Sequence, residues 1–390
     1  MNTLDYIIVI LFFIIMLGVG LISGRFIKST DDYYIGGGKI PWWLSGISHH
    51  VSGYSAVVFT GYAGIAYITG TAIYFWWAVN IGIAMIVGAY TIVPRWPRLR
   101  RALGIQSPTE YLKTRYNLPA QVIVSVSGVV VKVLDVGAKW ASIGILLHAF
   151  TGMPIWIGII VSSVIALVYM TIGGLLADLL TDFAQFIVQI LAGIGLFVGT
   201  LVHLNSMGLT MGGALAKLGE AGQLRVFNEG PGQGSALWTV FYIITIFLSY
   251  NGGTWNLAQR FISTTDDAQA KKSAIFSAIL YLVWPLILFF PMFVAPIIPG
   301  FEGMSQADAE ANLYSMLTMQ FLPNGLIGLV LASMFANTIT MCNSDMNVVS
   351  AVISRDLLPI FKPELLNRPD KVQLRNARLT TIGFTVLTIL

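Results

Sequence analysis

The sequence predicts an all-α protein that crosses a membrane many times, and two observations on its 390 residues carry this prediction. First, only 10% of the residues are charged while 56% are hydrophobic, and the mean hydropathy is +0.77. Soluble domains contain roughly one quarter charged residues. Second, the apolar residues are gathered into long runs, and about 20 consecutive apolar residues form a helix long enough to cross a bilayer.

Nine apolar runs are long enough to span a bilayer, and a tenth begins near residue 379. The first run has Asp5 before it in place of basic residues and is too long for a signal peptide, so we expect a retained leading helix at 5–24. The other runs follow at about 42–66, 73–94, 119–150, 154–172, 174–203, 236–259, 273–297 and 322–354. The tenth run stops at Leu390, too soon to cross. We therefore expect 1–390 to be one transmembrane domain that lacks its last part.

The basic residues predict how the chain is oriented. Most of the 22 lysines and arginines lie in four connections, at about 25–39, 95–115, 260–272 and 355–378. These connections share one side of the membrane if the spans are counted correctly, and the positive-inside rule makes that side cytoplasmic. We expect an outside N-terminus, a bacterial inner membrane as the location, and no nucleic-acid partner. The single cysteine, Cys342, excludes an internal disulfide framework.

Two of the predicted spans are interrupted by polar and small residues. The 42–66 span contains Ser48–Ser55, and the 236–259 span contains Ser249–Thr254. Non-helical backbone at membrane depth is tolerated only against protein or a wet cavity. Two broken helices in corresponding places, five spans apart, indicate an inverted-repeat transporter. The repeats would cover about 42–203 and, incompletely, about 236–390.

Charged residues inside spans are candidates for function, because burying them is costly. Lys132, Asp135 and Lys139 follow one another at intervals of three and four residues, which places them along one stripe of a helix. They could form an internal ladder of ion pairs or contact a substrate. Asp182 is a fourth candidate, with a capping role as the alternative. The adjacent His49 and His50 could bind a metal or carry protons, although no cysteine or acidic residue is next to them.

Several motifs, spread in order over nearly the whole chain, carry a family resemblance. They are Asp32–Gly38 followed by Pro41-Trp42-Trp43, then Ser55–Gly64, Ser107–Leu112, Gly173–Gln185 and Gln259-Arg260. In these motifs the sequence resembles the sodium/solute symporter family, which includes sodium–glucose, sodium–proline and sodium–sialic acid transporters. The resemblance implies a leucine-transporter-type inverted-repeat fold with an extra leading helix, working by alternating access.

The resemblance also implies Na+ as the coupling ion, held by oxygen ligands as a hard cation requires. The matching positions, two from the first broken helix and three from the eighth core helix, are Val51, Tyr54, Ser333, Ala336 and Asn337. Asp182 stands where the family has a carboxylate near the ion path. Ala336 has no side-chain oxygen, and Asn337 has an amide where Ser or Thr is usual. Proton coupling or weak sodium coupling is therefore an alternative.

Asp135 is the leading candidate for contact with the solute. It stands where the sialic acid transporters have a cationic residue that holds the substrate carboxylate, so the charge is reversed here. A carboxylate suits hydroxyl groups or an ammonium group, while Lys132 or Lys139 could still bind an acid. Tyr250 matches the aromatic gate of the sodium–glucose members, with simple packing as the alternative. The further candidates for solute contact are Asn80, Ser55, Trp77, Lys132 and Asn251.

These observations predict a transporter, not an enzyme. The expected function is sodium-coupled symport of a small polar solute, a sugar or sugar derivative. One alternative is proton-coupled or weakly sodium-coupled uptake of an organic acid or amino compound. An alternative of another class is a membrane sensor that keeps the scaffold without transport. The expected partners are the solute, sodium and the lipid bilayer, and the sequence sets no oligomeric state.

Overall fold

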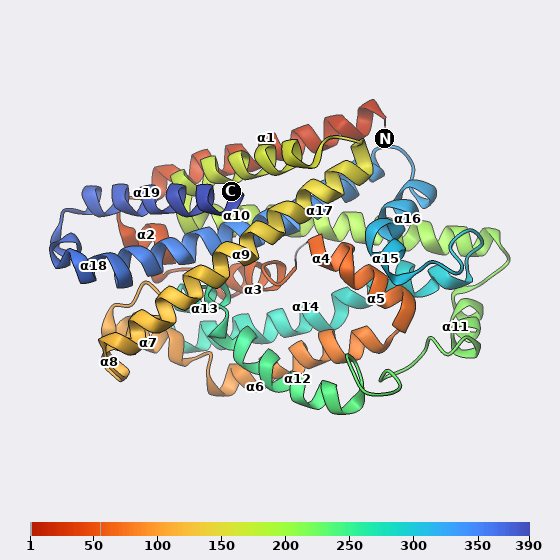
Figure 1. The fold of residues 1–390 in the computed structure, drawn as a ribbon, viewed down its shortest axis with the longest axis horizontal. Coiled ribbons are helices and arrows are strands. Elements are labelled where there is room, and N and C mark those ends of the chain that lie inside the picture. Colours follow the sequence, from red (N-terminus) through yellow and green to blue (C-terminus); the bar gives the residue numbers. More distant parts are fainter. Residues whose placement is uncertain (1, 55) are drawn as a thin grey trace.

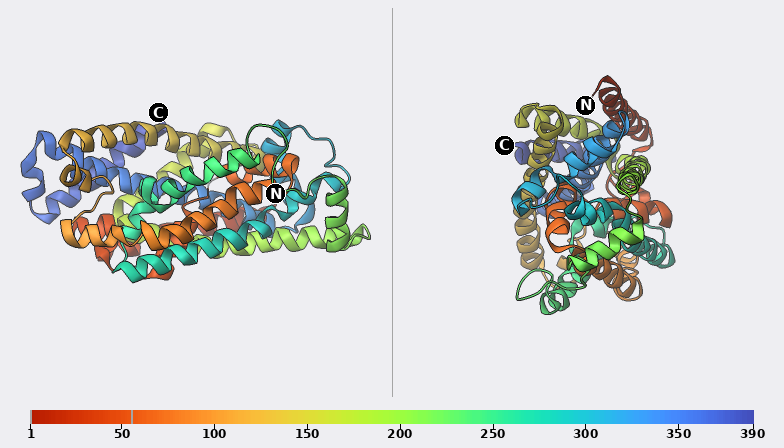
Figure 2. Two further views of the ribbon diagram at one scale, coloured as in Figure 1. Left: turned by 90° about the horizontal axis from the view of Figure 1, so that it is seen from below. Right: turned by 90° about the vertical axis from the view of Figure 1, so that its right-hand side faces the viewer.

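The computed structural model describes residues 2–54 and 56–390, and this part of the chain is a bundle of helices. Apart from an isolated parallel β-bridge between Ile40 and Thr264, these residues form helices, turns and loops, which confirms the all-α prediction. The bundle is elongated, and most of its long helices run roughly along its long axis (Figures 1 and 2).

The long helices form the body of the bundle. They are α1 (Thr3–Ser23), α6 (Asn80–Thr91), α9 (Leu118–Thr151), α10 (Ile155–Ser206), α12 (Ala236–Leu248), α14 (Asp267–Val294), α17 (Leu326–Val352) and α19 (Asp370–Ile389). Shorter helices lie between them. They are α2 (Thr30–Ile35), α3 (Trp42–Val51), α4 (Ala56–Phe59), α5 (Gly61–Thr69), α7 (Arg95–Leu103), α8 (Tyr111–Arg115), α11 (Met211–Glu220), α13 (Trp255–Ile262), α15 (Gln306–Asp308), α16 (Tyr314–Phe321) and α18 (Leu358–Phe361).

Single turns of 3-10 or π geometry connect several of these helices. The 3-10 turns are η1 (Gly24–Phe26), η2 (Gly36–Gly38), η5 (Ala295–Ile297) and η8 (Pro363–Asn367). The π turns are η3 (Tyr74–Val79), η4 (Ser249–Gly253), η6 (Ala309–Leu313) and η7 (Ile353–Leu357). Local π geometry inside a longer helix often accompanies a functional site.

Within residues 2–54 and 56–390, seven helical stretches are long and apolar enough to cross a membrane. Two features account for the difference from the nine predicted runs. The runs at 154–172 and 174–203 are two helical arms that meet at non-helical Gly174 and share the label α10, and the run at 42–66 is divided among α3, α4 and α5. Many of the large side chains on the outer face of α1 are apolar and exposed, including Ile7, Ile10 and Ile14. The protein is therefore an integral membrane protein.

The 52-residue element α10 consists of two helical arms that meet at Gly174, where φ is +50° and ψ is −144° and the backbone is not helical. Its two arms run back toward the same end of the bundle (Figure 1). A side chain at this position would be strained, and a Cβ atom would lie 2.5 Å from the backbone oxygen of Tyr33. Glycine is therefore what allows α2 to pack inside the bend.

The last two long helices, α17 and α19, differ from their predicted bounds for identifiable reasons. Helix α17 begins at Leu326, four residues later than predicted, because Gly325 adopts a φ of +93° just before it. The buried carboxylate of Asp5 in α1 accepts hydrogen bonds from the backbone N–H groups of Gly325 and Gly328, at 2.7 and 2.9 Å. Helix α19 begins at Asp370, nine residues before the apolar run, because its polar first turns are helical as well.

Both predicted interruptions are present. Helix α3 ends at Val51, and the chain resumes helical geometry in α4, beyond Ser55, which lies outside the described residues. The second interruption is η4, between α12 and α13, where Gly252 has a φ of +128°. The two breaks bring non-helical backbone into the interior of the bundle, where it must face protein or a cavity.

The predicted basic connections gather at one end of the molecule, which carries α2, α7, α8 and α18 (Figure 1). Ion pairs join separate elements there. Arg98 and Arg101 of α7 pair with Asp267 at the start of α14, and Arg355 of η7 lies 2.8 Å from Glu110, next to α8. The opposite end carries α11, α15 and α16. The basic connections therefore lie together at one end, as the loop pattern predicts.

Replacing Gly174 by alanine should destabilise the fold, because the added Cβ would clash with the backbone oxygen of Tyr33 at 2.5 Å. The φ of +50° also disfavours a side chain. We expect a loss of about 1–3 kcal/mol, seen as a lower melting temperature of the purified protein in detergent. Gly18→Ala is the matched control, because no atom lies within 4 Å of its Cβ position. Equal melting temperatures for the two variants would contradict this account of the bend.

Candidate functional site

A cavity of about 240 Å³ lies between the two broken helices and α9. Its walls come from the first break, α4, α5, η3, α9, η4 and α17, and they carry aromatic, small and charged side chains. The lining residues are Gly53, Val57, Val58, Tyr62, Trp77, Asp135, Ala138, Lys139, Tyr250 and Met341. We call this the central cavity. It brings together three predicted solute contacts, Asp135, Tyr250 and Trp77, from three elements that are far apart in the sequence.

Aromatic rings form one side of the central cavity. Tyr62 and Trp77 meet edge to face, with ring centroids 5.2 Å apart, and Tyr54 contacts the other side of Trp77 at 5.4 Å. Tyr250 is edge to face with Tyr281 of α14 at 5.5 Å. Edge-to-face packing of this kind holds each ring in a defined orientation. The cavity therefore has rigid aromatic walls next to its charged wall.

The charged wall is a network of four side chains that joins α9 to α17. Lys132 and Lys139 lie 3.0 and 2.8 Å from Oδ2 of Asp135, and each lies 2.7 Å from a carboxylate oxygen of Asp345. Asp345 is completely buried, whereas the Asp135 side chain remains 38% exposed. Two ammonium groups balance two carboxylates, so the network has no formal net charge. The predicted ladder of ion pairs exists, with a fourth member from a distant helix.

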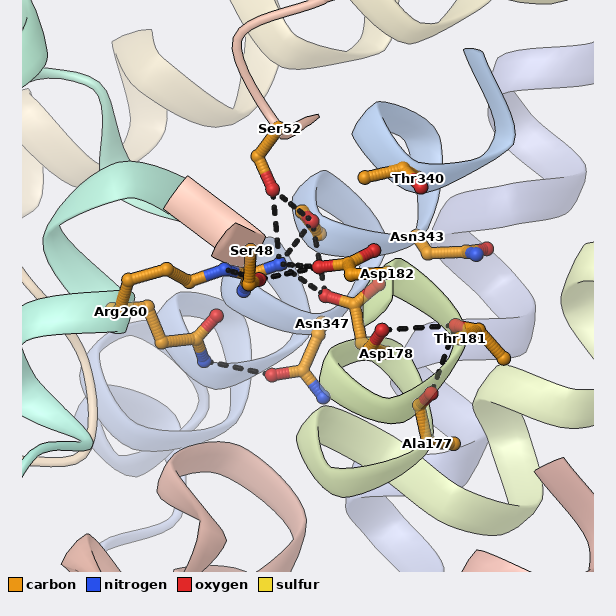
Figure 3. Close-up of polar contacts among 12 residues, drawn as sticks. Ser48, Ser52, Ala177, Asp178, Thr181, Asp182, Arg260, Thr340, Asn343 and Asn347 are labelled. Carbon is orange, nitrogen blue, oxygen red and sulfur yellow. Dashed lines mark hydrogen bonds and ion pairs between the residues drawn. The ribbon is translucent and has the colours of Figure 1, made fainter. Parts of the chain in front are cut away.

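A second charged cluster surrounds Arg260 of α13 (Figure 3). Its guanidinium Nη2 lies 2.5 Å from Oδ2 of Asp178 and 3.3 Å from Oδ2 of Asp182, both on α10. Ser48 of α3 accepts a hydrogen bond from Arg260 Nε at 2.8 Å and donates one to Asp182. Ser344 of α17 donates to Asp178 at 2.9 Å. Four helices therefore meet at one arginine.

This second cluster is not balanced. Two carboxylates face one guanidinium, and all three side chains are completely buried. Oδ1 of Asp178 and Oδ1 of Asp182 have no hydrogen-bond partner among the residues that the structure describes. A buried, uncompensated negative charge is costly. Carboxylate and hydroxyl oxygens are also the ligands that hard cations prefer. The cluster can therefore accept a small cation or a proton.

Two other predicted solute contacts, Asn80 and Asn251, are not among the residues that line the central cavity. Asn80 donates a hydrogen bond to the Thr239 carbonyl at 3.2 Å, which ties α6 to α12. Asn251 donates to the carbonyls of Ala84 and Phe247, at 3.0 and 2.8 Å. Both amides thus hold neighbouring backbone in place. Ser55 lies outside the described residues.

Lys132 lines a second cavity, of about 410 Å³, which lies between α9 and the second break and opens to the outside along exposed residues of α9 such as Val124 and Val131. Gly253, Thr254 and Trp255 form the wall on the side of that break. Asp135 lines both this second cavity and the central cavity. It therefore lies where the two cavities adjoin.

The predicted sodium positions are buried, on α3, on the first break and on α17. The Val51 carbonyl accepts a hydrogen bond from the Tyr54 N–H at 3.1 Å. The Ser333 carbonyl accepts one from the Asn337 amide at 2.8 Å. Ala336 lies between them on the buried part of α17. Asp182, by contrast, belongs to the Arg260 cluster.

Sequence reasoning missed the partners of these charges. Asp345 lies 206 residues from Lys139, so local spacing could not pair them. Arg260 was predicted as part of a family motif and of the basic connection at 260–272, but it is completely buried. A charged residue beside a broken helix is itself a signal of function. Asp178 precedes Asp182 by four residues, one turn away on the same helix face. This spacing could have predicted a pair of adjacent carboxylates from the sequence.

Comparison with known proteins identifies the family. Residues 33–390 match the model of the sodium:solute symporter family, which is most of the chain. The chain belongs to this family. The chain is 26% identical to the sodium/glucose cotransporter of Vibrio parahaemolyticus, over 92% of its own length and 69% of that protein. It is also 26% identical to the human sodium/iodide cotransporter, over 99% of its length and 60% of that protein.

A further relative is the sodium/sialic acid symporter of Proteus mirabilis, 25% identical over 88% of this chain and 68% of that protein. The chain thus spans between 60% and 69% of the length of these three relatives. A solved structure of a Na+-coupled sialic acid symporter in a substrate-bound, outward-open state superimposes with a TM-score of 0.85. It covers 100% of this chain and 81% of that chain at 19% identity, which establishes the shared fold.

Removing one carboxylate from the four-charge network should destabilise the protein strongly. Asp345→Asn leaves two buried ammonium groups facing one carboxylate, and breaking a buried ion pair in this way costs about 3–5 kcal/mol. The double variant Lys139→Met with Asp345→Leu should recover much of the loss, because Lys132 and Asp135 still balance. Melting temperatures in detergent measure both effects.

The exposed pair of Arg368 and Glu364 provides the control for this comparison, because both side chains are more than half exposed. Glu364→Gln should leave the melting temperature unchanged, since exposed ion pairs contribute little. If Asp345→Asn behaved like Glu364→Gln, the network would not be a buried, charge-balanced unit.

Proposed function

We propose that the protein couples the inward movement of sodium to uptake of a neutral, hydroxyl-rich solute of monosaccharide size. The observation that carries this proposal is the central cavity, whose walls come from both broken helices and whose charged wall is already neutral. Family membership supports sodium as the coupling ion. The relatives are named for glucose, iodide and sialic acid, so similarity to them leaves the solute class open. The proposed solute class therefore rests on the residues that line the central cavity.

The charge balance of the four-residue network argues against a charged solute. An anion bound beside Lys139 would leave the network and ligand with one excess negative charge, and a cation beside Asp135 would leave an excess positive charge. Either excess is costly in an enclosed, weakly polar site. A neutral solute keeps the balance.

The free oxygen of Asp135 suits a hydroxyl donor. Both lysines bind Oδ2, so Oδ1 can accept a hydrogen bond from a solute. A hydrogen bond to a charged group is worth about 1.5–3 kcal/mol. The rings of Tyr62, Trp77 and Tyr250 offer apolar faces beside this acceptor. Apolar walls with a few directed polar groups are the usual composition of a small-molecule site, and a sugar presents both kinds of surface.

The coupling cation has a candidate location in the Arg260 cluster. A sodium ion near Asp178 and Asp182 would neutralise the excess carboxylate, and a proton could do the same. The predicted carbonyl positions Val51 and Tyr54, together with Ser333, Ala336 and Asn337, remain the alternative sodium ligands. We further propose that the end rich in basic loops faces the cytoplasm, which leaves the N-terminus outside.

Uptake into proteoliposomes tests the function directly. An inward sodium gradient should drive accumulation of radiolabelled D-glucose, and an equal potassium gradient should not. D-gluconate has a similar carbon skeleton with a carboxylate, so it should be a poor solute for the wild type. Absence of uptake under both sodium and proton gradients, with D-glucose still bound in a thermal-shift assay, would contradict transport and favour a sensor.

Changing Asp135 should alter solute preference in a defined direction. Asp135→Asn replaces a charged acceptor by a neutral amide and gives the network one excess positive charge, so the KM for D-glucose should rise about tenfold. Uptake of D-gluconate relative to D-glucose should increase in the same variant. Glu364→Gln, which removes an exposed carboxylate elsewhere, should change neither value. An unchanged preference in Asp135→Asn would show that this residue does not face the solute.

Neutralising Asp178 should weaken ion coupling. Asp178→Asn leaves one carboxylate opposite Arg260, so the cluster loses its excess negative charge. Without that charge, the electrostatic attraction for a cation is weaker. We expect the sodium concentration for half-maximal uptake to rise at least about tenfold. Measuring uptake against sodium at several pH values separates the two ions. A response to pH but not to sodium in the wild type would favour proton coupling.

A further inference from the structure

His49 connects the helix before the first break to the backbone of the second break. It lies in the last turn of α3, two residues before the first break, and is completely buried. Its Nε2 lies 3.0 Å from the backbone oxygen of Tyr250 in the second break. Its Nδ1 lies 2.9 Å from the hydroxyl of Ser277 on α14. One imidazole, carried by the helix that precedes the first break, therefore contacts the second break and α14.

The hydrogen-bond partners of His49 determine which ring nitrogen carries the proton. A carbonyl oxygen can only accept, so Nε2 carries the proton that it donates to Tyr250. Nδ1 is then an acceptor, and Ser277 donates to it. The ring also packs against Phe261 of α13, with centroids 4.9 Å apart. The hydroxyl, the carbonyl and the neighbouring ring together allow one orientation and one tautomer.

The atom that His49 holds belongs to a wall of the central cavity. Tyr250 lines that cavity, and its backbone lies in a π turn in which Gly252 has left-handed geometry. Such a turn lacks the regular hydrogen bonding of a continuous helix. The contact with His49 therefore supplies a restraint that the local backbone cannot supply.

Helix α14 binds residues next to both breaks. Ser277 holds His49, and one turn later the hydroxyl of Tyr281 donates to the His50 carbonyl at 2.9 Å. The Tyr281 ring also packs edge to face with Tyr250. Both breaks are thus aligned against the same two turns of one helix.

We propose that His49 is a positioning residue that fixes the second break relative to the first and so sets the position of Tyr250 in the cavity wall. Its effect on solute affinity rests on the proposed function, whereas its effect on the second break does not. A role confined to packing would predict a general loss of stability. A positioning role predicts a local change at 249–254 and a change in solute affinity.

Hydrogen–deuterium exchange of the whole protein in lipid nanodiscs tests the local restraint. Peptides covering 249–254 should exchange about fivefold faster in His49→Phe and in Ser277→Ala, because a buried hydrogen bond is lost or misdirected. His49→Gln should stay closer to the wild type, since its amide can still donate to the carbonyl. Unchanged exchange at 249–254 in both His49→Phe and Ser277→Ala would overturn the proposal.

Ser273→Ala is the matched control for Ser277→Ala. Ser273 is buried on the same helix, one turn earlier, and also binds α3, through a 2.9 Å contact with Ser45. It does not contact His49 or Tyr250, so its replacement should leave exchange at 249–254 unchanged. Faster exchange in Ser273→Ala equal to that in Ser277→Ala would reduce the effect to general loosening of α14 and overturn the proposal.

A double-variant cycle with D-glucose uptake tests the functional consequence. His49→Phe alone should raise the KM about fivefold with a smaller change in kcat. In a Tyr250→Ala background the same change should have no further effect on KM, because the ring that His49 positions is absent. Additive effects would overturn the positioning role. If the wild type takes up no D-glucose, the proposed function fails, and the exchange experiment still decides the restraint.

Discussion

The whole arrangement depends on compensating charge where water is absent. Arg260 is completely buried, and it is held by carboxylates and hydroxyls from α3, α10 and α17. Removing a guanidinium from water costs several kcal/mol, and only close, well-directed partners offset that cost. The position of the short helix α13, and with it the second break, therefore depends on the partners of one side chain. The four-charge network does the same for α9 and α17, and the two clusters meet at the adjacent residues Ser344 and Asp345.

The fold could be predicted from the sequence because membrane spans and helix breaks leave local signals. Apolar runs and loop charges can be recognised from residues that are close together in the sequence. Both breaks coincide with short polar segments that contain glycine, such as Ser249–Thr254. The bounds were less accurate where a single residue decides them. Gly325 delays the start of α17, whereas Gly174 lies at the predicted boundary between the runs at 154–172 and 174–203.

The site could be predicted only in part, for a related reason. Asp135, Tyr250 and Trp77 stand out as polar or aromatic residues at membrane depth, and the structure brings them to one cavity. The role of Asn80 and Asn251 depends on which carbonyl lies opposite each amide, and no pattern along the chain contains that information. The same holds for Asp345, whose partners come from a helix some 200 residues earlier.

Asp135 lines both cavities, and the larger of them opens along exposed residues of α9 such as Val124 and Val131. The four-charge network therefore has an accessible end at Asp135, whose side chain is 38% exposed, and a closed end at Asp345, whose side chain is completely buried. Lys132 and Lys139 connect these two ends, so the network links a partly exposed face of α9 to the buried interior of α17.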